Sequence, residues 1–265
     1  MGDKGPDTVC ASLAAAAGLA GESAERQLMC PARVITGAFR GWLWAMIPGL
    51  LRVKVGTNEI LVSLMLVYVA EQLLASMALG AMRNPDGMGF PGSRNLAQYA
   101  SATSWINESA GMHWGVVTAF IAVIFAYVTL ARHMFGFQVR LAGQSPRAAA
   151  FAGVHPQRLV LICLGVSGAL AGMAGLFEVA GPAGQISIDF NVGYGFTAII
   201  VALLGRLHPV GILLACGLSA LPHFGGDIAP PTLGLPVAAL PPVHGFPPLF
   251  LRAVVVLTHC RCRCA

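Results

Sequence analysis

The sequence predicts an all-α fold, a polytopic integral membrane helix bundle with about five to seven membrane segments. Of its 265 residues, 56% are hydrophobic and only 10% are charged, whereas soluble domains carry about 25% charged residues. Its 32 glycines show no fixed period, and membrane helices tolerate glycine better than soluble helices do. Several apolar runs approach the roughly 20 residues that a helix needs to cross a bilayer.

The long apolar runs define the expected spans. The first contains Arg40 and Pro48, which weaken it, and the other three are strongly apolar. In order, the four runs are 34–51, 57–82, 114–131 and 159–180. Three shorter runs follow at 193–205, 210–224 and 250–258. Because the run 193–205 is too short for a bilayer core about 30 Å thick, we expect at least one short or broken membrane segment.

Three regions follow from this pattern. Residues 1–33 are expected to be a poorly ordered leader, and residues 34–224 a transmembrane domain. Residues 225–265 are expected to form an irregular tail rich in proline, since a proline inside a helix costs about 3 kcal/mol or more. The stretch 132–158 carries four arginines and no acid, and the bias of lysine and arginine toward cytoplasmic loops makes it cytoplasmic.

The basic stretch has its own local signals. Ser145 suits an N-cap and Pro146 the first helical position. Gly153 can end the helix in the left-handed conformation. We therefore expect a helix of about two turns, too short to be stable alone. An ordinary juxtamembrane loop, whose arginines only fix the topology, remains an alternative.

No catalytic constellation, cofactor motif or metal site stands out. The histidines share no i, i+4 spacing, and Cys260, Cys262 and Cys264 lack the spacing usual at zinc sites. The chain has no G-x-x-x-x-G-K-[ST] motif for nucleotide phosphates. No basic stripe with interleaved aromatics indicates nucleic-acid binding. We expect no enzyme, no metal and no cofactor.

Several blocks, in order, resemble one family. They are "PGLLRVKVGTNEILVSLMLVYVA", "NPDGMGFPGS", "GFQVRLAGQSPRAAAFAGV", "SGALAGMAGLFEVAG" and "GYGFTAIIVALLGRLHPVGILLA". Together they resemble permease subunits of bacterial ABC importers of the simple-sugar and nucleoside type, which are related to branched-chain amino-acid permeases. The resemblance covers roughly residues 41–235. Val67 replaces an asparagine usual in the family, the chain looks truncated at its N-terminus, and its C-terminal tail looks aberrant.

The resemblance implies a function and partners. The chain would be the membrane-spanning subunit of an ATP-driven importer for nucleosides or simple sugars, in the bacterial inner membrane. Its partners would be an ABC ATPase, a second permease subunit, an extracytoplasmic solute-binding lipoprotein and the lipid bilayer. The alternatives are a branched-chain amino-acid permease, a non-functional truncated membrane protein and an ATP-independent channel or carrier.

The candidate site residues fall into three groups. The resemblance implies that residues of the basic stretch couple to the ATPase: Gly143, Ser145, Pro146, Ala148, Ala149 and Gly153. Polar and aromatic residues in the apolar runs are candidates for the solute path, since charges inside membranes are costly: Asn58, Glu59, Tyr68, Glu71, Tyr194 and Phe196. Gly168 and Gly172 form a G-x-x-x-G pair, which predicts close helix packing.

Overall fold

The structure is a computed structural model, and it describes residues 26–80, 105–107, 112–180, 186 and 194–233. The chain divides into two compact units. Unit 1 comprises Met1–Ile121 and Met134–Gly195, and unit 2 comprises Ala122–His133 and Phe196–Ala265. The boundaries between the units fall within α4, between α4 and α5, and within α8, and each unit is described by itself.

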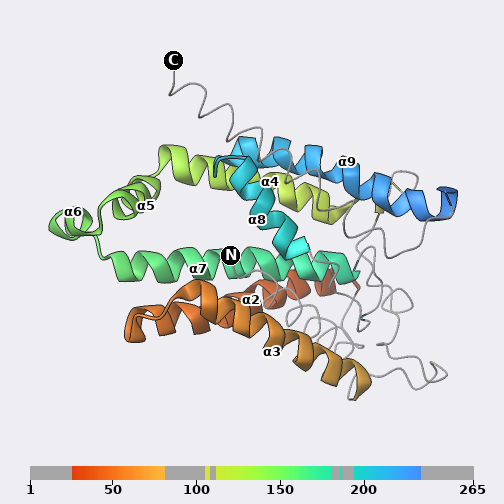
Figure 1. The fold of residues 1–265 in the computed structure, drawn as a ribbon, viewed down its shortest axis with the longest axis horizontal. Helices are drawn as coiled ribbons and strands as arrows, with labels where there is room; N and C mark the ends of the chain where they lie inside the picture. The colour runs from red at the N-terminus through yellow and green to blue at the C-terminus, as the bar shows by residue number, and fades with distance from the viewer. Residues whose placement is uncertain (1–25, 81–104, 108–111, 181–185, 187–193, 234–265) are drawn as a thin grey trace. The chain divides into compact units, whose positions relative to one another are not determined.

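The described residues are predominantly helical (Figure 1). The long helices are α2 (Arg26–Val55), α3 (Glu59–Leu79), α4 (Trp114–Arg132), α7 (Pro156–Glu178) and α9 (Pro209–Leu233), and the shorter ones are α5 (Met134–Gln144), α6 (Pro146–Phe151) and α8 (Tyr194–Leu204). Two short strands, β1 (Trp105–Asn107) and β2 (Met112–His113), pair antiparallel.

Four described helices are long and apolar enough to cross a membrane, and they confirm the four predicted spans. They are Val34–Val55 of α2, α3, α4 and α7. A shorter apolar stretch, Pro209–Leu221, begins α9. With α8 at 11 residues, the expectation of a short or broken segment is also confirmed. The apolar run 250–258 lies outside the described residues.

Two element boundaries differ from the expected ones, and two elements were not expected. Helix α2 begins at Arg26, inside the expected leader, and α9 continues to Leu233, inside the expected tail. Most of the leader and most of the tail lie outside the described residues. Helix α5 and the β1–β2 pair were not expected, because neither carries an apolar run of membrane length.

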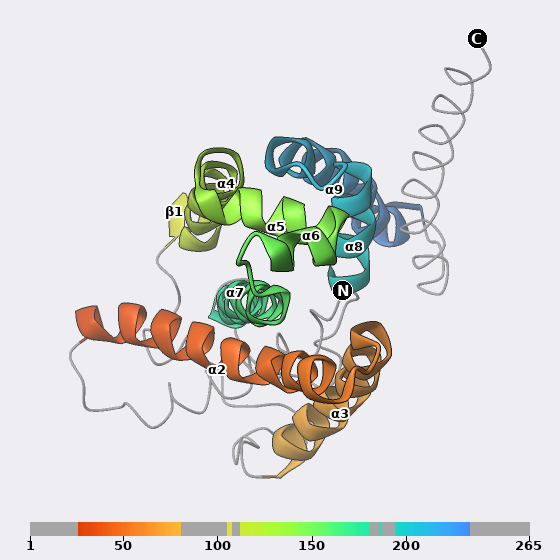
Figure 2. The ribbon, with the colours of Figure 1, turned by 90° about the vertical axis from the view of Figure 1, so that its left-hand side faces the viewer.

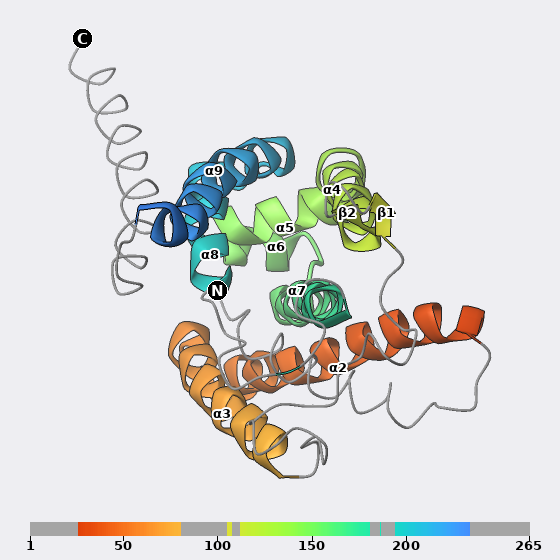
Figure 3. The same cartoon turned by 90° about the vertical axis from the view of Figure 1, so that its right-hand side faces the viewer.

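Helices α2 and α7 lie side by side in unit 1 (Figure 1 and Figure 3), and glycines bring their backbones together. A Cβ atom on Gly41 would overlap the carbonyl oxygen of Gly168 and lie 3.0 Å from the Cα of Gly172. A Cβ atom on Gly168 would overlap the Cβ of Ala45. Small residues at such positions let membrane helices approach closely and gain van der Waals contact.

The close approach continues along both helices. A Cβ atom on Gly165 would lie 2.6 Å from the indole nitrogen of Trp42, and one on Gly49 would lie 3.1 Å from Leu161. Gly37, near the opposite end of the contact, would meet Leu176 at 3.5 Å. The small residues of α2 therefore repeat every four positions, which places them on one face of the helix.

Helix α3 has one buried face. Its buried residues follow helical spacing: Ser63, Val67, Ala70, Leu74 and Ala78. Its opposite face exposes large apolar side chains such as Leu61 and Met65, which are 62% and 69% exposed. Helix α4 has no buried residue among those described. In a bilayer such faces contact lipid, because lipid tails are as apolar as these side chains.

Helices α8 and α9 of unit 2 are separated by a tight turn. Arg206 and Leu207 in this turn both have positive φ, at 52° and 58°. Non-glycine residues rarely adopt this conformation. The turn interrupts the apolar stretch that begins at Tyr194, and this explains why α8 ends after 11 residues.

We predict that Gly168→Ala destabilises the protein. The added methyl group would overlap Ala45, and overpacking of this kind costs about 1–3 kcal/mol. The measurement is thermal unfolding of the purified protein in detergent. The matched control is Gly217→Ala on α9, where a Cβ atom would meet nothing within 4 Å. Equal melting temperatures for the two variants would contradict the packing that we describe.

Candidate functional site

Helix α6 is a short helix with a defined start. Ser145 precedes it in an extended conformation, and its hydroxyl accepts a hydrogen bond from the amide of Ala148 at 3.4 Å. Pro146 occupies the first helical position, where its missing N–H is not needed. This is the N-terminal arrangement that the sequence predicts.

The end of α6 is also defined. Gly153 has a φ of 79°, and its amide donates to the carbonyl oxygen of Ala150 at 3.1 Å. The amide of Val154 donates to the carbonyl oxygen of Ala149 at 3.0 Å. These two bonds form a Schellman motif, which satisfies carbonyl groups left over at the helix end. The prediction of a left-handed glycine cap is confirmed.

The capped helix projects from one end of unit 1. Helix α5 leads into it, and α6 lies beyond the first turn of α7 (Figure 1 and Figure 2). Ala149 is fully buried, whereas Phe151 is 94% exposed. One side of α6 therefore packs inward and the other faces outward. We call α5 and α6 together the coupling segment, after the role that the resemblance implies and that is proposed below.

A cavity of about 560 Å³ separates the coupling segment from the ends of α2 and α3. Five helices of unit 1 contribute to its wall, through residues that include Arg52, Glu59, Gly143, Pro146, Val160 and Cys163. The α2–α3 junction and the basic stretch thus lie at the same end of unit 1. Arg52 and Lys54 at the end of α2 thus lie at the same end as the arginines of 132–158 that belong to unit 1, as expected if basic residues gather on the cytoplasmic side.

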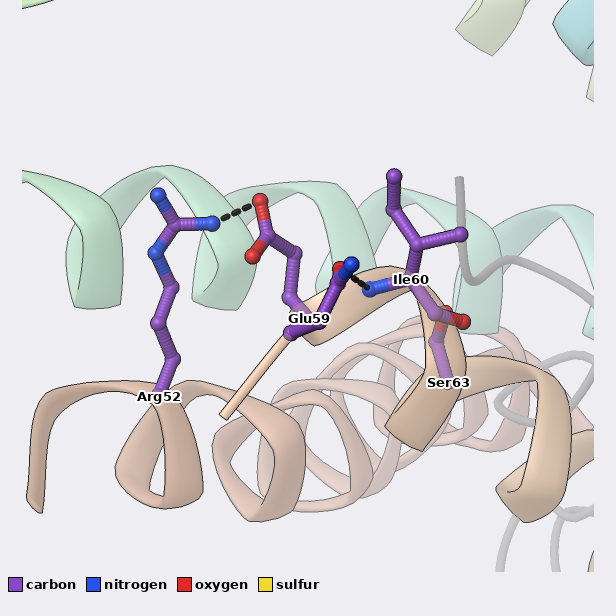
Figure 4. Close-up of polar contacts among 5 residues, drawn as sticks. Arg52, Glu59, Ile60 and Ser63 are labelled. Atoms are coloured by element: carbon purple, nitrogen blue, oxygen red, sulfur yellow. Dashed lines mark hydrogen bonds and ion pairs between the residues drawn. The ribbon is translucent and has the colours of Figure 1, made fainter. Parts of the chain in front are cut away.

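An ion pair closes one side of the cavity. The guanidinium of Arg52 on α2 pairs with the carboxylate of Glu59 on α3, and the two side chains point toward one another (Figure 4). The side chains are 39% and 33% exposed, so solvent screens the pair and it contributes less than about 1 kcal/mol. Its effect is to tie the end of α2 to the first turn of α3.

Asn58 and Glu59, both candidates for the solute path, have structural contacts in the described fold. The side chain of Asn58 caps α3 by accepting a hydrogen bond from the amide of Ile60 at 3.0 Å. Glu59 lies in the first turn of α3, where an acid suits the helix dipole. These local contacts explain why a polar and an acidic residue stand at the start of α3. The ion pair between Arg52 and Glu59 was not predicted from the sequence.

The remaining candidates are distributed over separate surfaces. Tyr68 is 65% exposed on α3. Glu71 is partly buried, next to the buried Ala70. Tyr194 and Phe196 lie in the first turn of α8, but their side chains lie outside the described part of the structure. The four candidates whose side chains are described, Asn58, Glu59, Tyr68 and Glu71, are spread along α3 and its N-cap.

Comparison with known proteins identifies the family. Residues 7–220 match the family described as "Branched-chain amino acid transport system / permease component". The chain belongs to this family. It is a multi-pass membrane protein of the ABC permease type, and the family is one of transport components rather than enzymes.

Individual relatives carry more specific names. A glucose ABC transporter permease protein of Haloferax volcanii is 35% identical over 84% of this chain and 60% of its own length. A nucleoside ABC transporter permease protein of Lactococcus lactis is 29% identical, and a guanosine ABC transporter permease protein of Bacillus subtilis is 27% identical. Each of these two alignments covers 78% of this chain and 60% of the relative.

The chain thus spans about three fifths of the curated relatives that it matches. No solved structure matches it. Within the described residues, no group of three or more His, Cys, Asp and Glu side chains could hold a metal ion.

We predict that Gly153→Ala loosens the end of α6. An alanine in the left-handed conformation costs roughly 1–2 kcal/mol, which corresponds to a factor of about 5–30 in a local opening equilibrium. Hydrogen exchange of the Gly153 and Val154 amides should accelerate by this factor. Gly143→Ala is the control, because a Cβ atom there meets nothing within 4 Å. Unchanged exchange in the Gly153 variant would contradict the cap.

Proposed function

We propose that this chain is a membrane-spanning permease subunit of an ATP-driven importer for nucleosides or simple sugars, and that the coupling segment receives the force of ATP hydrolysis. The observation that carries the proposal is the capped, projecting helix α6 in a chain of the permease family. The given sequence has no phosphate-binding P-loop motif, and we propose that the ATPase is a separate chain.

The local structure of α6 suits a helix that transmits force as a rigid unit. Both ends are capped, and Ala149 is fully buried at its inner side. A force applied to the exposed side would therefore move α6 as a unit. Gly153 and the small residues Gly143 and Ala148 leave room for close contact with a partner. The cavity behind the segment gives it space to move toward the Arg52–Glu59 ion pair.

The names of relatives support the proposed solute class. Of the three relatives reported above, two are named for nucleosides or guanosine and one for glucose. Both solute classes carry several hydroxyl groups on a sugar ring. We propose that Glu71 hydrogen-bonds the solute. It lies on α3 twelve residues after Glu59, which is about 18 Å deeper in the membrane at 1.5 Å per residue.

The proposed partners are those of a complete importer. An ABC ATPase would bind the coupling segment, a second permease subunit would complete the membrane path, and an extracytoplasmic solute-binding lipoprotein would deliver the solute. The family description favours a branched-chain amino acid as the alternative solute class. A non-functional remnant or an ATP-independent channel would show no dependence on ATP or on a binding protein.

Uptake by the host distinguishes these functions. Deletion of the chain should abolish ATP-dependent uptake of radiolabelled guanosine or glucose, and the wild-type chain should restore it. Ala149→Glu should not restore uptake, since a charge at this fully buried position displaces α6. Ala149→Ser, which keeps a small side chain, is the control. Loss of leucine uptake alone would favour the amino-acid permease and contradict the proposed solute class.

The orientation of the coupling segment has a separate test. A single cysteine in place of the exposed Gln144, in a chain whose seven native cysteines are replaced by serine, should react with an impermeant maleimide only in inside-out vesicles. The reason is that arginine-rich loops remain cytoplasmic. Labelling of intact cells or right-side-out vesicles would contradict the proposal.

A further inference from the structure

The outward side of α6 combines one aromatic and one basic side chain. Arg147 and Phe151 are four positions apart, so they lie on the same face of the helix. Both are exposed, and Phe151 at 94% is the most exposed of the large hydrophobic side chains in the described residues. Ala149, between them in sequence, is fully buried. The surface that α6 offers to a partner therefore includes Phe151 and excludes Ala149.

The stretch of chain around Phe151 carries basic charge and no acid. Arg147 shares its helix, Arg140 on the preceding α5 and Arg158 on the following α7 are exposed, and residues 132–158 contain no acid. Aromatic and arginine side chains are enriched among the residues that anchor protein interfaces.

We propose that Phe151 is the anchor by which this chain binds its ATPase, and that it inserts into an apolar pocket of the ATPase rimmed by acidic side chains. Arg147 and its neighbours pair with the rim. This inference rests on the proposed function and adds to it the residue that fixes the contact and the chemistry of the partner's surface. Ala149 holds α6 in place and does not touch the ATPase.

A lipid bilayer surface is the other partner that an exposed aromatic and basic face could bind. The position of α6 argues against it. Helix α7 has 23 residues and is about 35 Å long at 1.5 Å per residue, which already exceeds a hydrocarbon core of about 30 Å. Helix α6 lies beyond the start of α7 (Figure 1), so we infer that α6 lies outside the hydrocarbon core.

The first test replaces Phe151 with photoreactive benzoylphenylalanine in the tagged chain in its own host. Irradiation of membranes should give an adduct with a P-loop ATPase, and mass spectrometry should place the cross-link beside aspartate or glutamate residues. An adduct with lipid, or a cross-link to an ATPase surface without acidic residues, would overturn the inference.

The second test quantifies the ATPase that co-purifies with variants of the tagged chain. Phe151→Ala should lower recovery by about tenfold or more, as truncation of an interface anchor does, without disturbing α6, because the side chain makes little contact within the chain. Phe125→Ala on the membrane-spanning helix α4, which removes another exposed phenylalanine, 64% exposed, is the matched control and should retain the wild-type recovery.

The outcomes separate the two claims. If the wild-type chain recovers no ATPase, the proposed function fails. If the wild type recovers the ATPase and Phe151→Ala recovers it equally, the function stands and the anchor is wrong. Equal losses in the Phe151 and Phe125 variants would also contradict an anchor at Phe151. Arg147→Glu should lower recovery further than Arg147→Lys if the rim of the pocket is acidic.

Discussion

The backbone contact between α2 and α7 is the constraint on which unit 1 depends. Where Gly41 meets Gly168, neither residue could carry a side chain without overlap. In a bilayer no hydrophobic effect drives helices together, so the free energy of association comes from packing of this kind. The contact fixes α7 along α2, and α7 in turn carries the coupling segment at its N-terminal end. A change at the glycines would therefore alter the position of a segment far along the chain.

The packing is looser at the end of unit 1 that holds the coupling segment. There a cavity of about 560 Å³ lies between the coupling segment and the ends of α2 and α3, and one partly exposed ion pair bridges α2 and α3. Tight packing in the membrane and loose packing at one end suit a device that transmits movement, because close-packed helices resist deformation and a cavity does not. Helix α6, which is capped at both ends, is a rigid element at this loosely packed end.

Much of this arrangement was predictable from the sequence, for identifiable reasons. The four spans follow from run length, and the capping of α6 follows from Ser145, Pro146 and Gly153, whose conformational preferences are local. The G-x-x-x-G pair on α7 was recognised, but its counterpart on α2 was not. That counterpart is readable as small residues every four positions from Gly37 to Gly49, a signal that Arg40 and Pro48 concealed.

Other features required the structure. The Arg52–Glu59 pair and the burial of Ala149 depend on tertiary placement, which spacing along one helix does not encode.

The most direct test of movement in the coupling segment uses Cys163, which lines the cavity. In the assembled transporter, with the other six cysteines replaced by serine, the rate of Cys163 alkylation should change severalfold between the ATP-free state and a state trapped with ATP and vanadate. An identical rate in both states would contradict movement of the coupling segment against α2 and α3.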